Sequence, residues 1–336
     1  MIYSLPKSPT NGGKQFWSTQ PGVGSRTQPI SGPLRRLLFS GLLLLTVLQA
    51  NAQTTWTSRH QGQGGALVDV AYDGTGRYVS VGHDGLIRVS TDGIVWTTQV
   101  PGGSANNSLN AVVYAAGKFV TVGSIGRVLT STDGLTWVAQ ASGTVNALRG
   151  IAYGGGRFIA VGDGGIAITS TDGATWTTLT TGTSLNLLAI TYGSNQFVVV
   201  GQDGLIRTTP NGIIFTARTS NTVANLRGFT VGSGGSFVAV GANSAIVTST
   251  NGITWVLRSV AGPAISFTSV AYHPATGQYI AVSTTNNRLV TSADGITWTA
   301  GSSGTSLNLY GVRHVDGLFI AVGDFGMIRN SLAGLG

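Results

Sequence analysis

The sequence predicts an all-β protein, a seven-bladed β-propeller with four antiparallel strands per blade, formed by residues 53–336 as one domain. The first observation is a repeat whose starts lie 39 to 42 residues apart, the spacing of propeller blades. The second is a short segment ending in an aromatic residue, which recurs in six repeats. The third is a further aromatic segment, residues 54–59, ahead of the first complete repeat. The repeats start at Leu67, Leu109, Leu148, Leu187, Leu226, Phe267 and Leu309.

Each repeat contains four short β segments separated by turns, and the third repeat illustrates them. Its segments are rich in β-branched and aromatic residues, which favour strands. Its turns carry Gly or Asp-Gly, which accept the positive φ of tight hairpins. No stretch of useful length shows helical periodicity. The predicted strands of this repeat are Leu148–Tyr153, Arg157–Val161, Ile166–Ser170 and Thr175–Leu179.

The six recurring segments, called boxes below, read Ser/Thr-x-Asp/Asn-Gly-x-x-aromatic. We expect the hydroxyl to bond to nearby backbone, the Asp or Asn to accept turn N–H groups, and the Gly to adopt positive φ. We expect the aromatic ring to be buried between blades, a burial worth about 2–3 kcal/mol per ring. The boxes span residues 90–96, 131–137, 170–176, 209–215, 249–255 and 292–298.

The box Ser131-Thr-Asp133-Gly134-Leu-Thr-Trp137 and its five siblings carry a family resemblance. They resemble the Asp-box (BNR-type) repeats of sialidase-like and photosystem II assembly factor-like propellers, and the resemblance covers essentially all of residues 54–336. These boxes have one residue fewer between Asp and Trp than the usual family pattern, so they match a variant of it. The resemblance implies a propeller in which the box is structural and identifies no substrate.

The seventh repeat lacks its aromatic strand, because the chain ends shortly after the predicted strands Leu309–His314, Leu318–Val322 and Met327–Ser331. The segment around Trp56 is the missing strand. We therefore predict a last blade that combines three C-terminal strands with one N-terminal strand. Such closure pairs the two ends of the chain and removes free sheet edges.

The N-terminal region has the pattern of a leader. Residues 1–33 form a polar extension, which we interpret as disordered or as a misassigned start, and residues 34–52 are predicted to be a signal peptide. Arg35 and Arg36 precede an apolar run at 37–48, and Ala50-Asn51-Ala52 matches a cleavage site. The run is shorter than the ~20 residues that cross a bilayer, and a buried core helix is the alternative. We expect an exported protein that is periplasmic, extracellular or at the cell surface, without a membrane span in the mature chain.

The charge of the mature chain does not indicate nucleic-acid binding. The formal net charge of the whole chain is +8, but residues 1–52 carry five Lys and Arg and no acid. Residues 53–336 carry 14 Lys and Arg and 11 Asp, a net charge of +3, and contain no basic run. The chain has no Cys, which excludes disulfides, a thiol nucleophile and zinc bound by Cys.

Candidate functional residues are those at which the repeats differ at equivalent positions. The second residue of strand one and the turn between strands two and three both vary, and we expect them to surround the mouth of the central channel. Such a concave polar and aromatic surface suits a glycan, a peptide or a protein loop, although Asp-Gly is also the ordinary choice for a solvated turn. The candidates are Asn110, Arg149, Arg227, Tyr310, His83, Asp84, Asp163, Asp203 and Asp324.

Two acidic features favour structural roles. The box aspartates recur once per blade on the periphery, whereas carboxylates that cooperate in glycoside hydrolysis lie within about 10 Å of one another. Asp69 of blade one stands where the other first strands have a small residue. Arg313 of blade seven, like Asp69, is at an odd-numbered position of its first strand, so the two side chains point to corresponding sides of their strands. We expect an ion pair between them across the closure.

Tests for an enzyme are mostly negative. The chain has no Glu, which excludes the Tyr–Glu pair of sialidases. The four His residues fall at different positions of their blades, so we predict no metal site and no cofactor. We predict no catalytic residue and an exported monomer that acts as a non-enzymatic binding or assembly module for a glycan or protein ligand. The alternative is a polysaccharide-active hydrolase or lyase that uses Asp residues of the same face.

Overall fold

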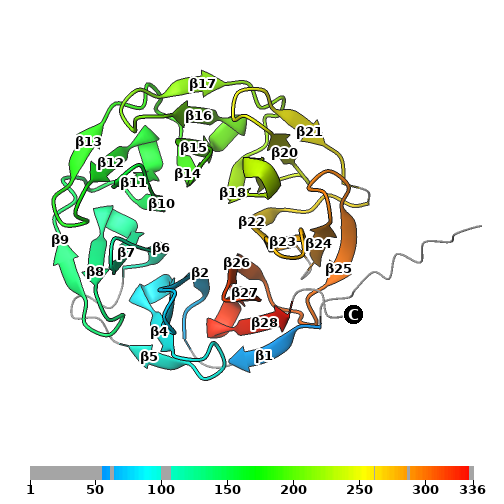
Figure 1. Cartoon of the computed structure of the whole chain (residues 1–336), viewed down its shortest axis with the longest axis horizontal. Coiled ribbons are helices and arrows are strands. Elements are labelled where there is room, and N and C mark those ends of the chain that lie inside the picture. The colour runs from blue at the N-terminus through cyan, green and yellow to red at the C-terminus, as the bar shows by residue number, and fades with distance from the viewer. Residues whose placement is uncertain (1–54, 61–63, 100–106, 261, 286–287, 333–336) are drawn as a thin grey trace, which may run out of the picture. The chain divides into compact units, whose positions relative to one another are not determined.

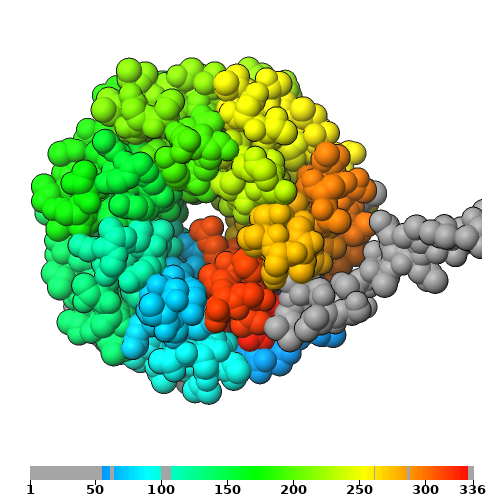
Figure 2. Space-filling model, in the orientation of Figure 1, coloured from blue at the N-terminus to red at the C-terminus, as the bar shows by residue number. Residues whose placement is uncertain are grey.

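The computed structural model describes residues 55–60, 64–99, 107–260, 262–285 and 288–332. Seven four-stranded antiparallel sheets surround a central opening, which confirms the predicted propeller (Figure 1). Figure 2 shows that the opening is not filled by side chains. The polar extension at 1–33 and the signal peptide at 34–52 lie outside the described residues, so both stay predictions. Within the described part, no helix is long and apolar enough to cross a membrane.

The innermost strand of every blade lines the central opening, and the second strand pairs with it (Figure 1). The innermost strands are β2 (Leu67–Tyr72), β6 (Leu109–Ala115), β10 (Leu148–Gly154), β14 (Leu187–Gly193), β18 (Leu226–Val231), β22 (Phe267–Tyr272) and β26 (Leu309–Val315). The second strands are β3 (Tyr78–Gly82), β7 (Lys118–Gly123), β11 (Arg157–Gly162), β15 (Gln196–Gly201), β19 (Phe237–Gly241), β23 (Tyr279–Ser283) and β27 (Leu318–Gly323).

The third and fourth strands complete each blade towards the rim. The third strands are β4 (Ile87–Ser90), β8 (Val128–Ser131), β12 (Ala167–Ser170), β16 (Ile206–Thr209), β20 (Ile246–Ser249), β24 (Arg288–Ser292) and β28 (Ile328–Leu332). The fourth strands are β5 (Thr97–Gln99), β9 (Val138–Gln140), β13 (Thr177–Leu179), β17 (Thr216–Arg218), β21 (Val256–Arg258), β25 (Thr299–Ser302) and, in blade 7, β1 (Thr57–His60).

Six single 3₁₀ turns occur in the described residues, and five of them join the second strand to the third. Those five are η1 (His83–Gly85), η2 (Ser124–Gly126), η3 (Asp163–Gly165), η4 (Gln202–Gly204) and η6 (Asp324–Gly326). The remaining turn, η5 (Ser233–Gly235), joins the first two strands of blade 5.

The last blade closes as the sequence predicted, in the order β1-β28-β27-β26. Thr57 pairs with Asn330, so the N-terminal strand lies antiparallel to the C-terminal one. Arg329 Nη2 donates a hydrogen bond of 2.6 Å to the carbonyl oxygen of Trp56, and Trp56 is only 8% exposed. Deleting this strand together with Trp56 would therefore remove an aromatic core residue and expose the edge of β28.

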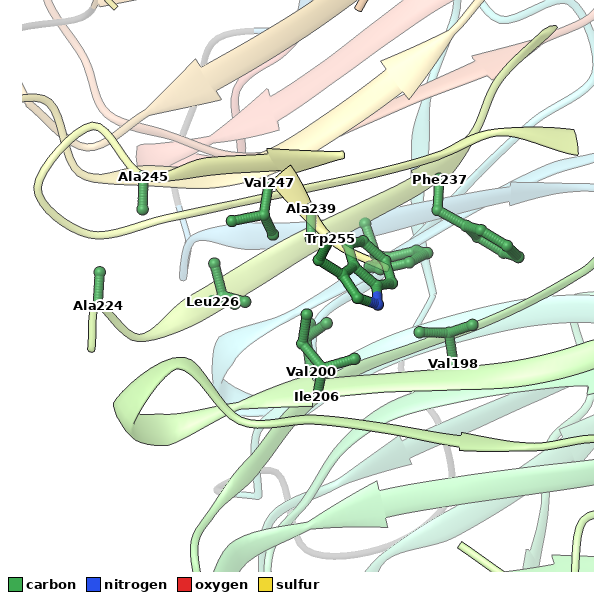
Figure 3. Close-up of a cluster of buried hydrophobic side chains, with 11 residues drawn as sticks. Val198, Val200, Ile206, Ala224, Leu226, Phe237, Ala239, Ala245, Val247 and Trp255 are labelled. Atoms are coloured by element: carbon green, nitrogen blue, oxygen red, sulfur yellow. The ribbon is translucent and has the colours of Figure 1, made fainter. Parts of the chain in front are cut away.

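The hydrophobic core is divided into clusters that lie between neighbouring blades. Figure 3 shows one of them, in which Val198 and Ile206 of blade 4 pack against Phe237 and Trp255 of blade 5. The apolar residue at the start of each first strand is fully buried, as Leu226 is here. Because each blade covers the face of the next, no blade can bury its core without its neighbours.

The box turn has the predicted geometry, which blade 3 illustrates. Asp172 Oδ1 accepts hydrogen bonds of 2.8 Å from the backbone N–H groups of Ala174 and Thr175. These two bonds hold the pKa of the Asp172 carboxyl well below its usual value. Trp176 is buried and donates from Nε1 to the carbonyl oxygen of Gly173. The Asp172 carboxylate therefore stabilises the turn in which it lies, which agrees with a structural role for the boxes.

The fourth strand starts later than the sequence predicted. In blade 3 it begins at Thr177 rather than Thr175. The reason lies in the box, because the N–H of Thr175 is taken by Asp172 and is not available to a neighbouring strand.

Candidate binding face at the channel mouth

The turn between strands two and three lies against the start of the first strand in the same blade. In blade 3 the N–H of Asp163 donates to the carbonyl oxygen of Ala147 at 2.9 Å. Gly162 permits this approach, because a Cβ there would collide with that carbonyl group. Equivalent hydrogen bonds occur at His83, Ser124, Gln202 and Asp324. The two variable positions of each blade therefore lie at one end of the propeller, called the mouth face below.

At the mouth face, hydrogen bonds connect each of several blades to the next one. Gly164 N–H of blade 3 donates to Asn186 Oδ1, which precedes β14, at 2.8 Å. Asp203 N–H of blade 4 donates to Asn225 Oδ1, which precedes β18, at 3.0 Å. The predicted site residue Asn110 donates from Nδ2 to the carbonyl oxygen of Leu148 in the next blade at 2.7 Å. Its amide therefore already contributes to the joint between blades 2 and 3.

Two of the predicted site residues pair with each other. Arg149 donates from Nε and Nη2 to the two carboxylate oxygens of Asp163, at 2.9 and 2.7 Å. The hydrogen bonds to Asp163 raise the pKa of the Arg149 guanidinium above its usual value. A paired geometry of this kind orients both groups but leaves little net charge at this part of the face.

Three further site residues come together where blade 7 meets blade 1. Tyr310 donates from Oη to Asp324 Oδ1 at 2.9 Å, and Asn308 N–H donates to Asp324 Oδ2 at 3.1 Å. The His83 ring of blade 1 lies 6.1 Å from the Tyr310 ring, centroid to centroid. Burial and the hydrogen bond to Asp324 raise the pKa of Tyr310. The phenol therefore stays protonated and remains a hydrogen-bond donor at neutral pH.

The remaining predicted residues lie separately on the mouth face. Asp84 is exposed in the η1 turn, and Arg227 is exposed near the start of β18. Asp203 is exposed and borders a groove of about 790 Å³ that also contains Arg207 and Arg218. A groove at the matching place in blade 2, of about 770 Å³, includes Ile125 and Arg127.

The candidate residues chosen from the sequence did not include two apolar residues of this face. Ile125 and Phe325 are 61% and 62% exposed in the middle of the η2 and η6 turns. Other blades carry Gly, Asp or Asn at the equivalent position, and that difference was the available signal. These two residues add an apolar component to a face that the sequence predicted to be mainly polar.

The two histidines of blades 6 and 7 are neighbours, which sequence reasoning also missed. The rings of His273 and His314 lie 4.1 Å apart, centroid to centroid. Burial, with a smaller effect from His273, lowers the pKa of His314 to about 4. The two residues are offset by one position within their blades, so comparing equivalent positions did not reveal the contact. Among the described residues, no group of three His, Cys, Asp or Glu side chains forms a metal-binding cluster.

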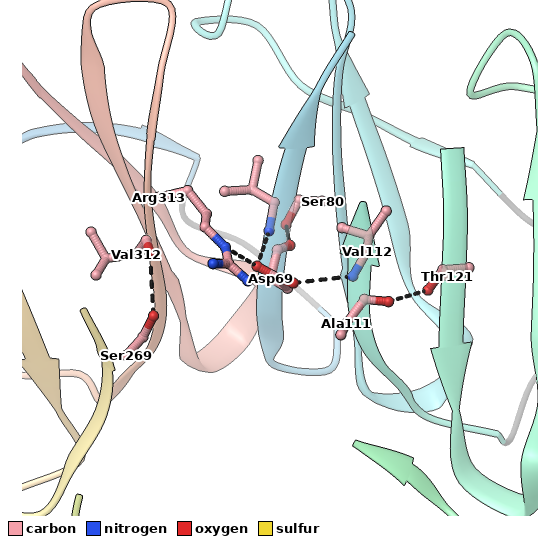
Figure 4. A network of polar contacts seen from close by, with 9 residues as sticks. Asp69, Ser80, Ala111, Val112, Thr121, Ser269, Val312 and Arg313 are labelled. Atoms are coloured by element: carbon pink, nitrogen blue, oxygen red, sulfur yellow. Dashed lines mark hydrogen bonds and ion pairs between the residues drawn. The ribbon is translucent and has the colours of Figure 1, made fainter. Parts of the chain in front are cut away.

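The predicted ion pair across the closure is present (Figure 4). Arg313 donates from Nε and Nη2 to the two carboxylate oxygens of Asp69, at 2.8 and 3.2 Å. Asp69 Oδ2 also accepts the N–H of Val112 in blade 2 at 3.1 Å. The pair therefore links three consecutive blades through their innermost strands, which is a structural role.

Comparisons with known proteins find similarity at the level of the fold. No protein-family model and no curated protein sequence matches this chain. A structure of YCF48 bound to D1 peptide is 17% identical, covers 85% of this chain and 100% of its own, and superposes with a TM-score of 0.70. YCF48 from Cyanidioschyzon merolae is 15% identical, covers 82% of this chain and 98% of its own, and has a TM-score of 0.67.

Antibiotic lyases are similar to a comparable degree. Virginiamycin B lyase from Staphylococcus aureus is 12% identical, covers 83% of this chain and 99% of its own, and has a TM-score of 0.75. A catalytically inactive variant of that lyase, solved with quinupristin, has a TM-score of 0.76. At these identities the similarity establishes the β-propeller fold and leaves the activity of this chain to its own residues.

Proposed function

We propose that this chain is an exported, non-enzymatic binding or assembly module that holds a segment of a partner protein against the mouth face. One observation carries the proposal: two variable positions of each blade, the second residue of the first strand and the turn between strands two and three, lie together at this end, where several of their side chains are exposed. Equivalent positions of a repeat protein meet the same packing requirement. Positions that depart from the repeat and are exposed are therefore the ones available for recognition.

The chemistry of the face supports binding rather than turnover. Asp163 is neutralised by Arg149, and Asp324 accepts hydrogen bonds from Tyr310 and Asn308. Such groups orient a ligand and do not form a pair of free carboxylates for acid and base steps. The peptide held by YCF48 is consistent with a protein segment as the ligand class. Export rests on the leader pattern at 34–52.

The proposal is tested by probing peptide and glycan arrays with the purified protein. We compare wild type with the double variant Arg149→Ala/Arg227→Ala and with Ile296→Ala, a control at an exposed residue of a box turn. We expect retention on peptides, at least a tenfold loss in the double variant, equivalent to about 1.4 kcal/mol, and no change in the control. Retention on glycans alone would replace protein by glycan as the ligand. Retention on neither array would overturn the proposal.

A lyase or hydrolase that uses Asp residues of the same face is the second candidate. It is favoured by the cluster of His83, Tyr310 and Asp324, and by the similarity to virginiamycin B lyase. Turnover of quinupristin and of polysaccharides by the purified protein tests it. An enzyme would lose turnover by orders of magnitude in Asp163→Asn or Asp324→Asn, whereas a binding protein would only bind more weakly.

A further inference from the structure

The turn between strands two and three places its middle residue in the left-handed region of backbone conformation in six blades. Gly, Asp and Asn tolerate this conformation at little cost, and four of these blades carry one of them. The residues, with their φ angles, are Asp84 (57°), Ile125 (48°), Gly164 (66°), Asp203 (54°), Asn243 (54°) and Phe325 (53°).

Ile125 and Phe325 are the exceptions. A β-branched or bulky side chain is strained at positive φ. Burial could offset that strain, but both side chains are more than 60% exposed. Because the backbone of this turn has a similar conformation in the other blades that form it, a Gly or Asn at this position would be less strained. Strain that stability does not explain indicates a function.

The surroundings of Phe325 are aromatic and acidic. Its neighbour Asp324 accepts the hydroxyl of Tyr310, and the Tyr310 ring lies 6.1 Å from that of the exposed His83. Asp84, which follows His83, is exposed at the tip of the η1 turn. This corner of the mouth face therefore offers aromatic faces beside carboxylates.

Blades 7, 1 and 2 are consecutive around the ring, so their turn tips present an apolar, an acidic and an apolar residue in that order (Figure 1). These are Phe325, Asp84 and Ile125. The turns η1, η2 and η6 themselves contain two carboxylates, Asp84 and Asp324, and no Lys or Arg. Arg88 lies beside Gly326 of η6 but is only 2% exposed and contacts His60. Arg127 lies in the groove with Ile125 and donates to the carbonyl oxygen of Asn107. The exposed charge on the turns themselves is therefore the Asp84 carboxylate.

We propose that this arc, defined by Phe325, Tyr310, His83, Asp84 and Ile125, is the docking site for a partner segment in which a basic residue stands between two apolar residues. The apolar side chains contact Phe325 and Ile125. The Lys or Arg lies against the Tyr310 ring and the Asp84 carboxylate. The ring attracts the cation through a cation–π contact and the carboxylate attracts it through its opposite charge, whereas a neutral glycan has no charge to interact with either group. This inference rests on the proposed function and specifies the partner's chemistry.

The test uses variants that should not damage the fold. Phe325→Gly removes the aromatic side chain and relieves the backbone at the same time, so the protein should melt at the same or a higher temperature. Asn243→Gly is the matched control, because it changes the same turn position in blade 5. Asp84→Asn removes the exposed charge and keeps a residue that tolerates positive φ.

The probes are three sets of short synthetic peptides with basic, acidic or neutral residues between apolar ones, with a panel of neutral oligosaccharides. We expect the basic set to bind best, with an affinity that falls as salt rises from about 0.05 to 0.5 M. Phe325→Gly and Asp84→Asn should each weaken it at least tenfold, and Asn243→Gly should leave it unchanged.

Several results would overturn the inference. One is preference for the acidic or neutral set, and another is full binding by Phe325→Gly. If peptides bind but only Arg149→Ala/Arg227→Ala weakens them, the docking site is wrong and the proposed function stands. If no peptide binds and only oligosaccharides do, this inference and the protein-binding proposal both fail.

Discussion

Arg313 of β26 and Asp69 of β2 form a two-pronged ion pair across the interface between the last blade and the first, with Arg313 Nε 2.8 Å from Asp69 Oδ1. Both residues replace small or β-branched residues of the other blades. The strand β1 of blade 7 is followed in the chain by β2 of blade 1, so the ring closes noncovalently where β1 pairs with β28. The ion pair reinforces the interface next to that closure.

We predict that Asp69→Asn lowers the free energy of unfolding by about 1–3 kcal/mol. It leaves Arg313 without its counter-charge and weakens the acceptor for Val112 N–H. The loss is limited because the Arg313 side chain is 42% exposed and water screens its charge. The double variant Asp69→Ala/Arg313→Thr, which restores residues found in other blades, should recover much of the loss. Urea denaturation of the single and double variants measures the coupling, and strictly additive losses would contradict it.

We predict that deleting residues 53–60 strongly destabilises the protein, because the deletion removes β1 and the buried Trp56. Trp56→Ala alone should cost about 3–5 kcal/mol. Thr57→Ala, at an exposed residue of the same strand, is the control. Thermal melting of the three variants beside wild type provides the measurement. A truncated chain that melts with the wild type would show that closure does not depend on this strand.

We predict a loss of stability in mild acid from the histidines between blades 6 and 7. The pKa of His314 is lowered from 6.5 to about 4, because burial disfavours its charged form. The folded protein therefore binds fewer protons than the unfolded chain. The stabilisation is complete above about pH 6.5 and is lost as the pH falls towards about 4, by up to about 2 kcal/mol after allowance for partial exposure.

The variant His314→Tyr tests this directly, because most other first strands carry Tyr at the equivalent position. Urea unfolding at about pH 7 and about pH 5 should show a smaller difference in the variant than in wild type. His83→Gln, at an exposed histidine, should keep the wild-type difference. An unchanged difference in His314→Tyr would assign the acid sensitivity to other groups.

We predict that Asn251→Asp stabilises the box of blade 5. Asn251 Oδ1 accepts the N–H groups of Ile253 and Thr254 at 2.8 and 3.0 Å, as Asp172 does in blade 3. A carboxylate accepts such bonds more strongly than an amide, so we expect a gain of about 0.5–1 kcal/mol at neutral pH. The reverse change Asp172→Asn should cost a similar amount. Thermal melting at about pH 7 checks both, and a loss in Asn251→Asp would contradict the account.

The amino-acid sequence by itself determined the number of blades, the closure by the segment around Trp56, the Asx-type turn of the boxes and the pairing of Asp69 with Arg313. These features follow from spacing, strand parity and turn chemistry, which act between residues that the repeat already aligns. The candidate residues of the mouth face could be chosen in the same way, because each departs from its repeat.

Only the tertiary structure decided what those residues do to one another. It showed that Arg149 pairs with Asp163 and that His273 lies beside His314. It also showed that the Asn110 amide donates a hydrogen bond to Leu148 of the next blade. It also placed Phe325 and Ile125, exposed, in the left-handed conformation of a turn that the other blades share. The physical reason is that the repeat shows which positions of the blades are equivalent but not which side chains are in contact. The packing of one blade against the next brings side chains together across the interface. The length of each side chain then determines which neighbour it contacts.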